Sequence, residues 1–147
     1  MTTNRPSRLS AAAFATENVD RQRLGNLRLG LLRLHKTLLD AERIAYERSH
    51  GRVSNHRMLQ LVISDEWFSW LHPLSELVVQ IDEAIKADDP VTAEIAKPLL
   101  DQARALLTST ETDTRFAQQY RQALQLEPDV VLSHVAMTKF LSEAPQE

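Results

Sequence analysis

Apolar residues recur at alternating steps of four and three between residues 54 and 86, and this is the clearest pattern in the chain. The stripe consists of Ile63, Trp67, Trp70, Leu74, Leu77 and Ile81. Such spacing is typical of a helix that packs along the axis of a helical bundle. Pro73 removes one backbone hydrogen-bond donor, but the apolar spacing continues across it. The pattern therefore predicts one long helix over residues 54–86 with a kink at Pro73.

A second stripe predicts an earlier helix from about residue 16 to residue 50. It consists of Leu24, Leu27, Leu31, Leu34, Leu38, Ala41 and Ala45. Thr16 is a suitable N-cap, Gly51 favours the left-handed conformation that ends many helices, and Ser54 is a suitable cap for the next helix. Two helices of roughly 33 residues with so short a connection form an antiparallel hairpin about 50 Å long.

The rest of the chain predicts further, shorter helices. The Asp-Asp-Pro sequence at 88–90 favours the start of a third helix that contains Pro98. A polar run at 108–114 is typical of a loop. Apolar steps of four resume at Phe116, and Pro128 divides this last region into two shorter helices or one bent helix.

The predicted fold class is an all-α, up-down-up-down four-helix bundle that is built on the long antiparallel hairpin. Kinks are expected at Pro73, Pro98 and near Pro128. A single domain is expected to cover residues 16–142. It is preceded by a flexible tail at residues 1–15 and followed by a frayed C-terminus at residues 143–147.

Composition mainly excludes classes of binding and of enzyme chemistry. With 43% hydrophobic and 25% charged residues and only three glycines, the chain is typical of an ordered helical domain. The net charge of −3 and the dispersed basic residues give no reason to expect nucleic-acid binding. The absence of cysteine excludes disulfides, thiolate zinc sites and cysteine nucleophiles. The sequence also lacks glycine-rich phosphate loops and nucleophile motifs, which disfavours the enzyme classes that need them.

The apolar runs are far shorter than the roughly 20 residues that span a bilayer. We therefore expect a soluble, cytoplasmic protein that does not bind membranes. Residues 1–16 contain arginine, serine and threonine but no acid, a composition that organellar targeting segments share. The alternative for this segment is a plain flexible tail.

Polar residues at seven-residue intervals interrupt the apolar face of the first predicted helix. They are Arg28, His35, Glu42 and Ser49. A second polar line on the next helix consists of Asp65, Ser69, His72, Glu76 and Glu83. In a hairpin that turns near residue 52, side chains lie level when their residue numbers sum to about 104, because both arms rise 1.5 Å per residue. This register predicts that Arg28 pairs with Glu76.

The same register brings two histidines and two carboxylates toward one another. They are His35, Glu42, Asp65 and His72, and they form the predicted site. Imidazole and carboxylate groups are the ligands of iron, manganese and zinc sites in bundle cores. One interpretation is therefore a divalent transition metal within the hairpin. The alternative, which needs no cofactor, is a structural polar network or a partly exposed seam between the helices.

Other ionisable residues carry weaker signals. Glu47 and His50 have the Glu-x-x-His spacing, which resembles half of a ferritin-like di-iron motif, but the sequence contains no second such pair. His56 is close enough along the chain to join them in a metal clip at the hairpin tip. His134 shares a helix face with apolar residues, so it is either a core histidine or an additional ligand.

These patterns favour a small non-catalytic protein that acts by binding a protein partner or another copy of itself. Two alternatives stay open. One is the metal-binding bundle, and the other is a carrier of apolar ligands, which requires an enclosed cavity beside Trp67 and Trp70. Phe68 faces away from the tryptophan stripe, and it would mark a partner surface if it were exposed together with Leu61 and Val79.

Overall fold

The computed structural model describes the backbone of residues 8–110 and 113–143, and within those ranges the side chains from residue 18 onward. Every element in this part of the chain is a helix, which confirms the all-α fold class. The elements are α1 (Arg8–His50), α2 (Asn55–Ser64), the 3-10 helix η1 (Glu66–Leu71), α3 (His72–Lys86), α4 (Ala93–Thr108), α5 (Arg115–Leu126) and α6 (Pro128–Glu143). None of the described helices is long and apolar enough to cross a membrane.

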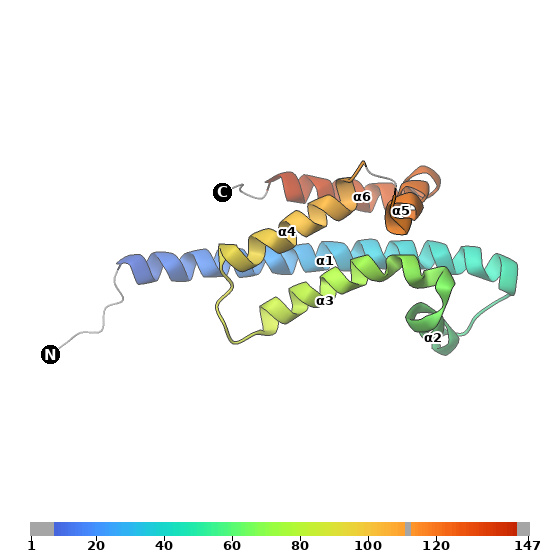
Figure 1. Ribbon diagram of the computed structural model, residues 1–147, viewed down its shortest axis with the longest axis horizontal. Coiled ribbons are helices and arrows are strands. Elements are labelled where there is room, and N and C mark those ends of the chain that lie inside the picture. The colour runs from blue at the N-terminus through green and yellow to red at the C-terminus, as the bar shows by residue number, and fades with distance from the viewer. Residues whose placement is uncertain (1–7, 111–112, 144–147) are drawn as a thin grey trace.

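α1 is the long axis of the molecule, and three shorter helices pack against it (Figure 1). α3, α4 and α6 each contact α1, and α4 also contacts both α3 and α6. These three helices therefore form a layer across α1 with α4 in the middle. α5 contacts η1 and α6, toward the C-terminal end of α1. This arrangement does not confirm the predicted up-down-up-down order of four helices.

The N-terminal end of α1 differs from the sequence-based prediction. α1 begins at Arg8, so Thr16 lies within the helix and is not its N-cap. The alanines at 11–13 favour this extension, because alanine has the highest helix propensity. The remaining parts of the predicted tail and of the predicted C-terminal end, residues 1–7 and 144–147, lie outside the described residues.

The predicted leucine stripe of α1 is confirmed as the centre of the core. Leu24, Leu27, Leu31 and Leu34 are fully buried. The facing helices contribute the buried residues Leu74, Leu77, Ile81, Leu99, Leu100, Ala103, Val130, Met137 and Leu141. Burial of apolar side chains from four helices in one cluster is the main source of stability for this part of the molecule.

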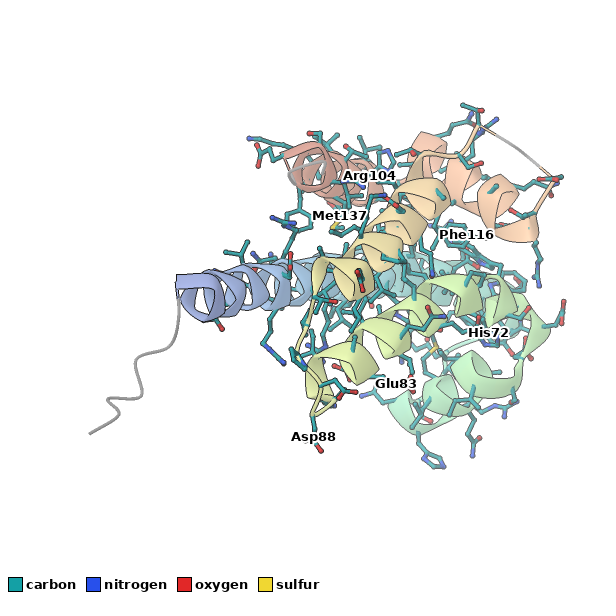
Figure 2. All side chains as sticks on the ribbon, turned by 60° about the vertical axis from the view of Figure 1, so that its left-hand side comes forward. His72, Glu83, Asp88, Arg104, Phe116 and Met137 are labelled. Carbon is teal, nitrogen blue, oxygen red and sulfur yellow. The ribbon has the colours of Figure 1, made fainter. Side chains whose placement is uncertain are left out.

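Close packing between α1 and α6 depends on Gly30. A β-carbon at this position would overlap the Sδ atom of Met137, which is buried. Arg104 on α4 lies near Met137 (Figure 2), and its Nη2 donates a hydrogen bond to the Leu141 carbonyl oxygen at 2.9 Å. α6 is therefore held against both α1 and α4.

The prediction of a single helix over residues 54–86 is wrong, because the chain forms three elements there. Asp65 leaves the helical conformation (φ −88°, ψ 139°), and its side chain accepts a hydrogen bond from the Trp67 backbone N–H at 2.8 Å. This N-cap starts η1. Pro73 lies in the first turn of α3, where its missing N–H leaves no helical bond unmade. It therefore starts a helix and does not kink one.

The break at Asp65 also changes which residues are buried. Ile63 belongs to the predicted stripe but is 66% exposed. Phe68, which is predicted to face away from the tryptophan stripe, is fully buried and forms a second, smaller core with Met58 and Leu61. Phe68 therefore does not mark an exposed partner surface.

Other predicted helix ends are confirmed. Gly51 follows α1 with a φ of +84°, and its N–H donates to the Glu47 carbonyl oxygen at 2.8 Å. Ser54 caps α2 by accepting a hydrogen bond from the Arg57 backbone N–H at 3.1 Å. Pro128 opens α6, so the last region contains two shorter helices, one of the two predicted alternatives.

The third predicted helix begins later than expected. α4 starts at Ala93 with Thr92 as the preceding residue, so the predicted start at residues 88–90 is wrong. α4 continues through Pro98, and this proline does not divide the helix.

α1 and α3 pack as the arms of a hairpin, but their register differs from the predicted one. Arg28 Nε lies 2.6 Å from Asp82 Oδ1, whereas Glu76, its predicted partner, is exposed. Hydrogen bonds from Lys86 and Arg28 lower the pKa of Asp82. The predicted register assumed a continuous second arm. α2 and η1 instead pack on each other as separate elements between α1 and α3. α3 therefore lies at a different position along α1 from the one that the predicted register gave.

Candidate functional site

The four residues of the predicted metal site do not form one cluster. In the described residues, no group of three or more histidine or acidic side chains is placed to hold a metal ion. Asp65 is used as the cap of η1, and His72 Nε2 lies 3.4 Å from the Val62 carbonyl oxygen. His35 is half-buried on α1, and burial lowers its pKa. The break at Asp65 explains the difference, because it separates residues that the prediction had placed on one continuous helix face.

The weaker candidates at the end of α1 belong to the local structure. A Glu47 carboxylate oxygen accepts a hydrogen bond from the Val53 backbone N–H at 2.9 Å. His50 Nδ1 lies 3.2 Å from the Tyr46 carbonyl oxygen, and the two rings stack with centroids 4.0 Å apart. Both side chains therefore fix the turn between α1 and α2.

His134 is a partly buried histidine with a hydrogen-bond partner. Its Nδ1 lies 2.6 Å from the Tyr120 hydroxyl oxygen. Burial raises the pKa of Tyr120 and lowers the pKa of His134, so burial favours the neutral form of both groups. The pair joins α5 to α6.

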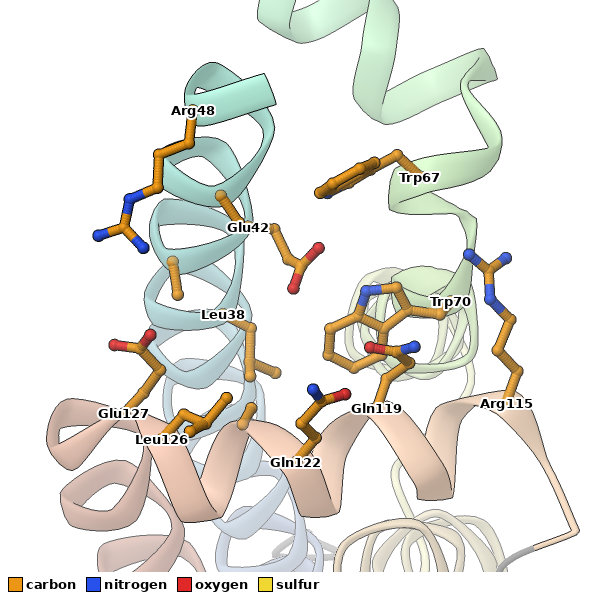
Figure 3. A pocket seen from close by; sticks show the side chains of 13 residues that line it. Leu38, Glu42, Arg48, Trp67, Trp70, Arg115, Gln119, Gln122, Leu126 and Glu127 are labelled. Atoms are coloured by element: carbon orange, nitrogen blue, oxygen red, sulfur yellow. The ribbon is translucent and has the colours of Figure 1, made fainter. Parts of the chain in front are cut away.

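The leucine stripe of α1 loses volume beyond Leu38, and a pocket lies there. The same face of the helix continues with Ala41, Ala45 and Arg48. A space of about 420 Å³ remains between α1, η1 and α5, and we call it the indole pocket (Figure 3). Its lining residues are Leu38, Ala41, Glu42, Ala45, Arg48, Trp67, Trp70, Arg115, Gln119, Gln122, Ala123, Leu126 and Glu127.

Both tryptophans of the chain line the indole pocket. Trp70 is 3% exposed and packs on Phe116 of α5 with ring centroids 5.7 Å apart, while Trp67 is half-buried. The indole N–H of each is buried. Both N–H groups act as donors toward the Glu42 carboxylate, which faces them in the pocket. The two donors therefore do not by themselves require a ligand as acceptor.

The carboxylate of Glu42 projects from α1 into the space in front of the tryptophans (Figure 3). Burial raises the pKa of Glu42 above the usual glutamate range, and the nearby indole N–H groups only partly oppose this effect. Arg115 also acts on this carboxylate from a distance, but its guanidinium is paired with Glu66 at 2.9 Å. Glu42 is therefore a partly desolvated acid at the centre of the pocket.

α5 and the residue after it supply the polar wall of the pocket. Gln119 and Gln122 lie beside Trp70 and can both donate and accept hydrogen bonds (Figure 3). Glu127 and Arg48 are exposed and lie together at the opposite end from Arg115 (Figure 3). The ionised groups other than Glu42 therefore lie at the rim.

The sequence analysis missed the α5 side of the pocket, although a signal was present. Arg115, Gln119 and Gln122 recur at helical steps of four and three. They lie on a different face of the helix from Phe116 and Tyr120, which are buried in the core. A polar stripe of this kind is usual on solvent-facing helices, so nothing in the sequence shows that it borders the tryptophans.

The indole pocket joins an apolar floor to amide groups and one partly desolvated carboxylate. Such a combination can hold a small amphipathic molecule, with its apolar part on the floor and a polar group at Glu42. Comparisons of the chain with protein-family models, with curated proteins and with solved structures found no match. The function therefore has to be argued from the chemistry of the pocket itself.

Proposed function

We propose that this protein is a non-catalytic binding protein that holds a small ligand in the indole pocket. The observation that carries the proposal is the pocket of about 420 Å³ that both tryptophans line and that the Glu42 carboxylate enters. A partly buried carboxylate with a raised pKa in such a pocket is a candidate binding group. The pocket is partly open to solvent, so it differs from the enclosed cavity that a carrier of apolar ligands requires.

The size and lining of the pocket support the same function. Its volume of about 420 Å³ falls in the range of small-molecule sites, which is about 300–1,000 Å³. Ala41, Ala45 and Ala123 leave room for a ligand, while Leu38 and Trp70 offer apolar surface. A molecule with an aromatic ring or a short aliphatic chain therefore fits the floor.

Intrinsic fluorescence tests this proposal directly, because both tryptophans of the chain line the pocket. Amphipathic small molecules are screened for a saturable change in tryptophan emission, and each hit is checked for a rise in the melting temperature. Ala45→Leu is expected to abolish the response by filling the pocket. Ala136→Leu makes the same change at an exposed position of α6 and is the matched control.

Two outcomes would contradict the proposal. One is a screen in which no molecule gives a saturable response. The other is a response that survives in Ala45→Leu, because the ligand would then bind elsewhere.

The outer side of α6 favours a second candidate function, which is self-association. Val131, Leu132 and Val135 are exposed there by 37%, 69% and 55%. Adjacent exposed apolar side chains are typical of contact surfaces. Leu132→Glu is expected to turn an oligomer into a monomer in light scattering, whereas Leu59→Glu, at a similarly exposed leucine of α2, leaves the mass unchanged. A wild-type chain that is monomeric at high concentration would exclude this candidate.

A further inference from the structure

We infer that the ligand of the indole pocket is an organic amine, whose protonated nitrogen binds the Glu42 carboxylate while its apolar body lies on the pocket floor. The inference rests on the proposed function and adds the chemical class of the ligand. Three features of the pocket support it: the distribution of charge, the free hydrogen-bonding capacity of Glu42, and the apolar lining beside it.

The distribution of charge favours a cation. Glu42 is the ionisable group that stands among the tryptophans, whereas Arg48 and Glu127 are exposed at the rim. The Arg115 guanidinium is held by the Glu66 carboxylate at 2.9 Å and by the Ser69 hydroxyl at 2.5 Å. An anionic ligand on the floor would therefore lie beside a carboxylate whose charge is not neutralised locally, and like charges repel.

The hydrogen-bonding capacity of Glu42 also favours a donor ligand. An ionised carboxylate offers about four lone-pair sites. The indole N–H groups of Trp70 and Trp67 act as donors on one side of this carboxylate. The side toward the open pocket stays available. An ammonium group has three donors and no acceptor, and its bonds to a carboxylate are charge-assisted.

The apolar lining offers room for the rest of the ligand. Leu38, Ala41 and Ala45 then leave space for the apolar part of the same molecule. The pocket therefore suits one molecule with a charged end and an apolar end.

Three probes with the same apolar body test the inference: 4-phenylbutylamine, 4-phenylbutanol and 4-phenylbutyrate. Binding is followed by proton–nitrogen NMR of the full chain, which has two tryptophans and hence two indole N–H signals. Trp67→Phe and Trp70→Phe assign these signals. The amine is expected to shift both signals saturably and to bind about tenfold or more tightly than the alcohol, because it forms a partly buried charge pair. The carboxylate is expected to bind most weakly.

Glu42→Gln removes the charge of the pocket and keeps its shape, so it tests the contribution of the charge alone. It is expected to weaken amine binding about tenfold or more and alcohol binding much less, because the neutral hydroxyl loses no charge pair; the retained alcohol binding also shows that the pocket is intact. Glu76→Gln makes the same change at an exposed position of α3 and is expected to leave all three affinities unchanged.

Some outcomes overturn the inference and leave the proposed function standing. These are binding of the alcohol or the carboxylate as tightly as the amine, and amine binding that survives in Glu42→Gln. If none of the three probes shifts an indole signal, the amine inference also fails. The fluorescence screen then decides separately whether the pocket binds any other class of ligand.

Discussion

The two halves of α1 continue one apolar stripe but build different structures. From Leu24 to Leu38 the stripe consists of leucines, and α3, α4 and α6 close over them. Beyond Leu38 it continues with Ala41 and Ala45, and the indole pocket lies there. The helix itself is continuous through both halves. The comparison teaches that the pocket results from a loss of side-chain volume on the stripe and not from a change of secondary structure.

The same comparison separates a rigid part of the molecule from an adaptable one. The leucine half belongs to a large buried cluster to which α1, η1, α3, α4, α5 and α6 all contribute. The alanine half meets η1 and the smaller core of Met58, Leu61 and Phe68. Regions with fewer buried apolar contacts open at lower free energy than the main core, and binding sites are drawn from such regions. We therefore expect the pocket end to respond to ligands while the leucine half holds the fold.

The largest expected effect comes from making the leucine half resemble the alanine half. Leu31→Ala removes a fully buried side chain and is expected to lower the free energy of unfolding by about 3 kcal/mol, through lost burial and a new cavity. Denaturant unfolding measures this. Leu29→Ala, at a neighbouring residue that is 49% exposed, is the control and is expected to change stability by less than about 1 kcal/mol. Equal effects at both positions would disprove the proposed core.

Gly30 and Gly25 give the next largest contrast. Gly30→Ala is expected to destabilise the protein by about 1–2 kcal/mol, because the new methyl group overlaps the buried Met137 side chain. Gly25→Ala meets nothing within 4 Å and is expected to stabilise the protein by up to about 1 kcal/mol through helix propensity. Thermal unfolding of both variants measures the difference. A stabilised Gly30→Ala would show that the Met137 side chain moves aside without cost.

The reverse change makes the alanine half resemble the leucine half by extending the leucine stripe into the pocket. Ala45→Leu is expected to raise the free energy of unfolding by about 1 kcal/mol, because it buries apolar area in unfilled space. The tryptophan emission should shift at the same time. Ala136→Leu, at an exposed position of α6, is the matched control in denaturant unfolding. If Ala45→Leu destabilises the protein more than Ala136→Leu does, the pocket is already filled by its own side chains.

The smallest expected effect concerns Glu42. Because its pKa is raised on folding, the folded chain holds the proton more tightly than the unfolded chain, and ionisation therefore disfavours folding. This loss of stability is absent at pH values below the ordinary glutamate pKa. It reaches its full size at pH values above the raised pKa of the folded chain. Glu42→Gln should therefore raise the melting temperature slightly at neutral pH and lose this advantage at acidic pH. A variant that is less stable than wild type at neutral pH would show that the charge stabilises the fold.

Much of the fold could be predicted because its causes are local. The helical spacing of the leucines from Leu24 to Leu38, the left-handed Gly51 and the Ser54 cap are properties of short segments, and the structure confirms them. The break at Asp65 could not be distinguished by periodicity, because the apolar spacing continues across it. One aspartate that caps η1 outweighs a pattern that favours a continuous helix.

The candidate site could be predicted only in part. Glu42 stood out as a charge on an apolar face, and the tryptophans stood out by their size. Their convergence with Gln119 and Gln122 depends on α5, which is distant along the chain. The pairing of Arg28 with Asp82 likewise depends on how far α2 and η1 displace α3.

By itself, then, the sequence determined which segments are helical and which face of α1 is buried, because periodicity and capping act within a few residues of one another. Only the tertiary structure decided the hairpin register, the use of Asp65 as the cap of η1, and the placement of Glu42 in a pocket with η1 and α5. These outcomes depend on contacts between segments that are far apart in the chain. Side-chain volume and the angle at each turn set those contacts, and neither is encoded in the spacing of apolar residues.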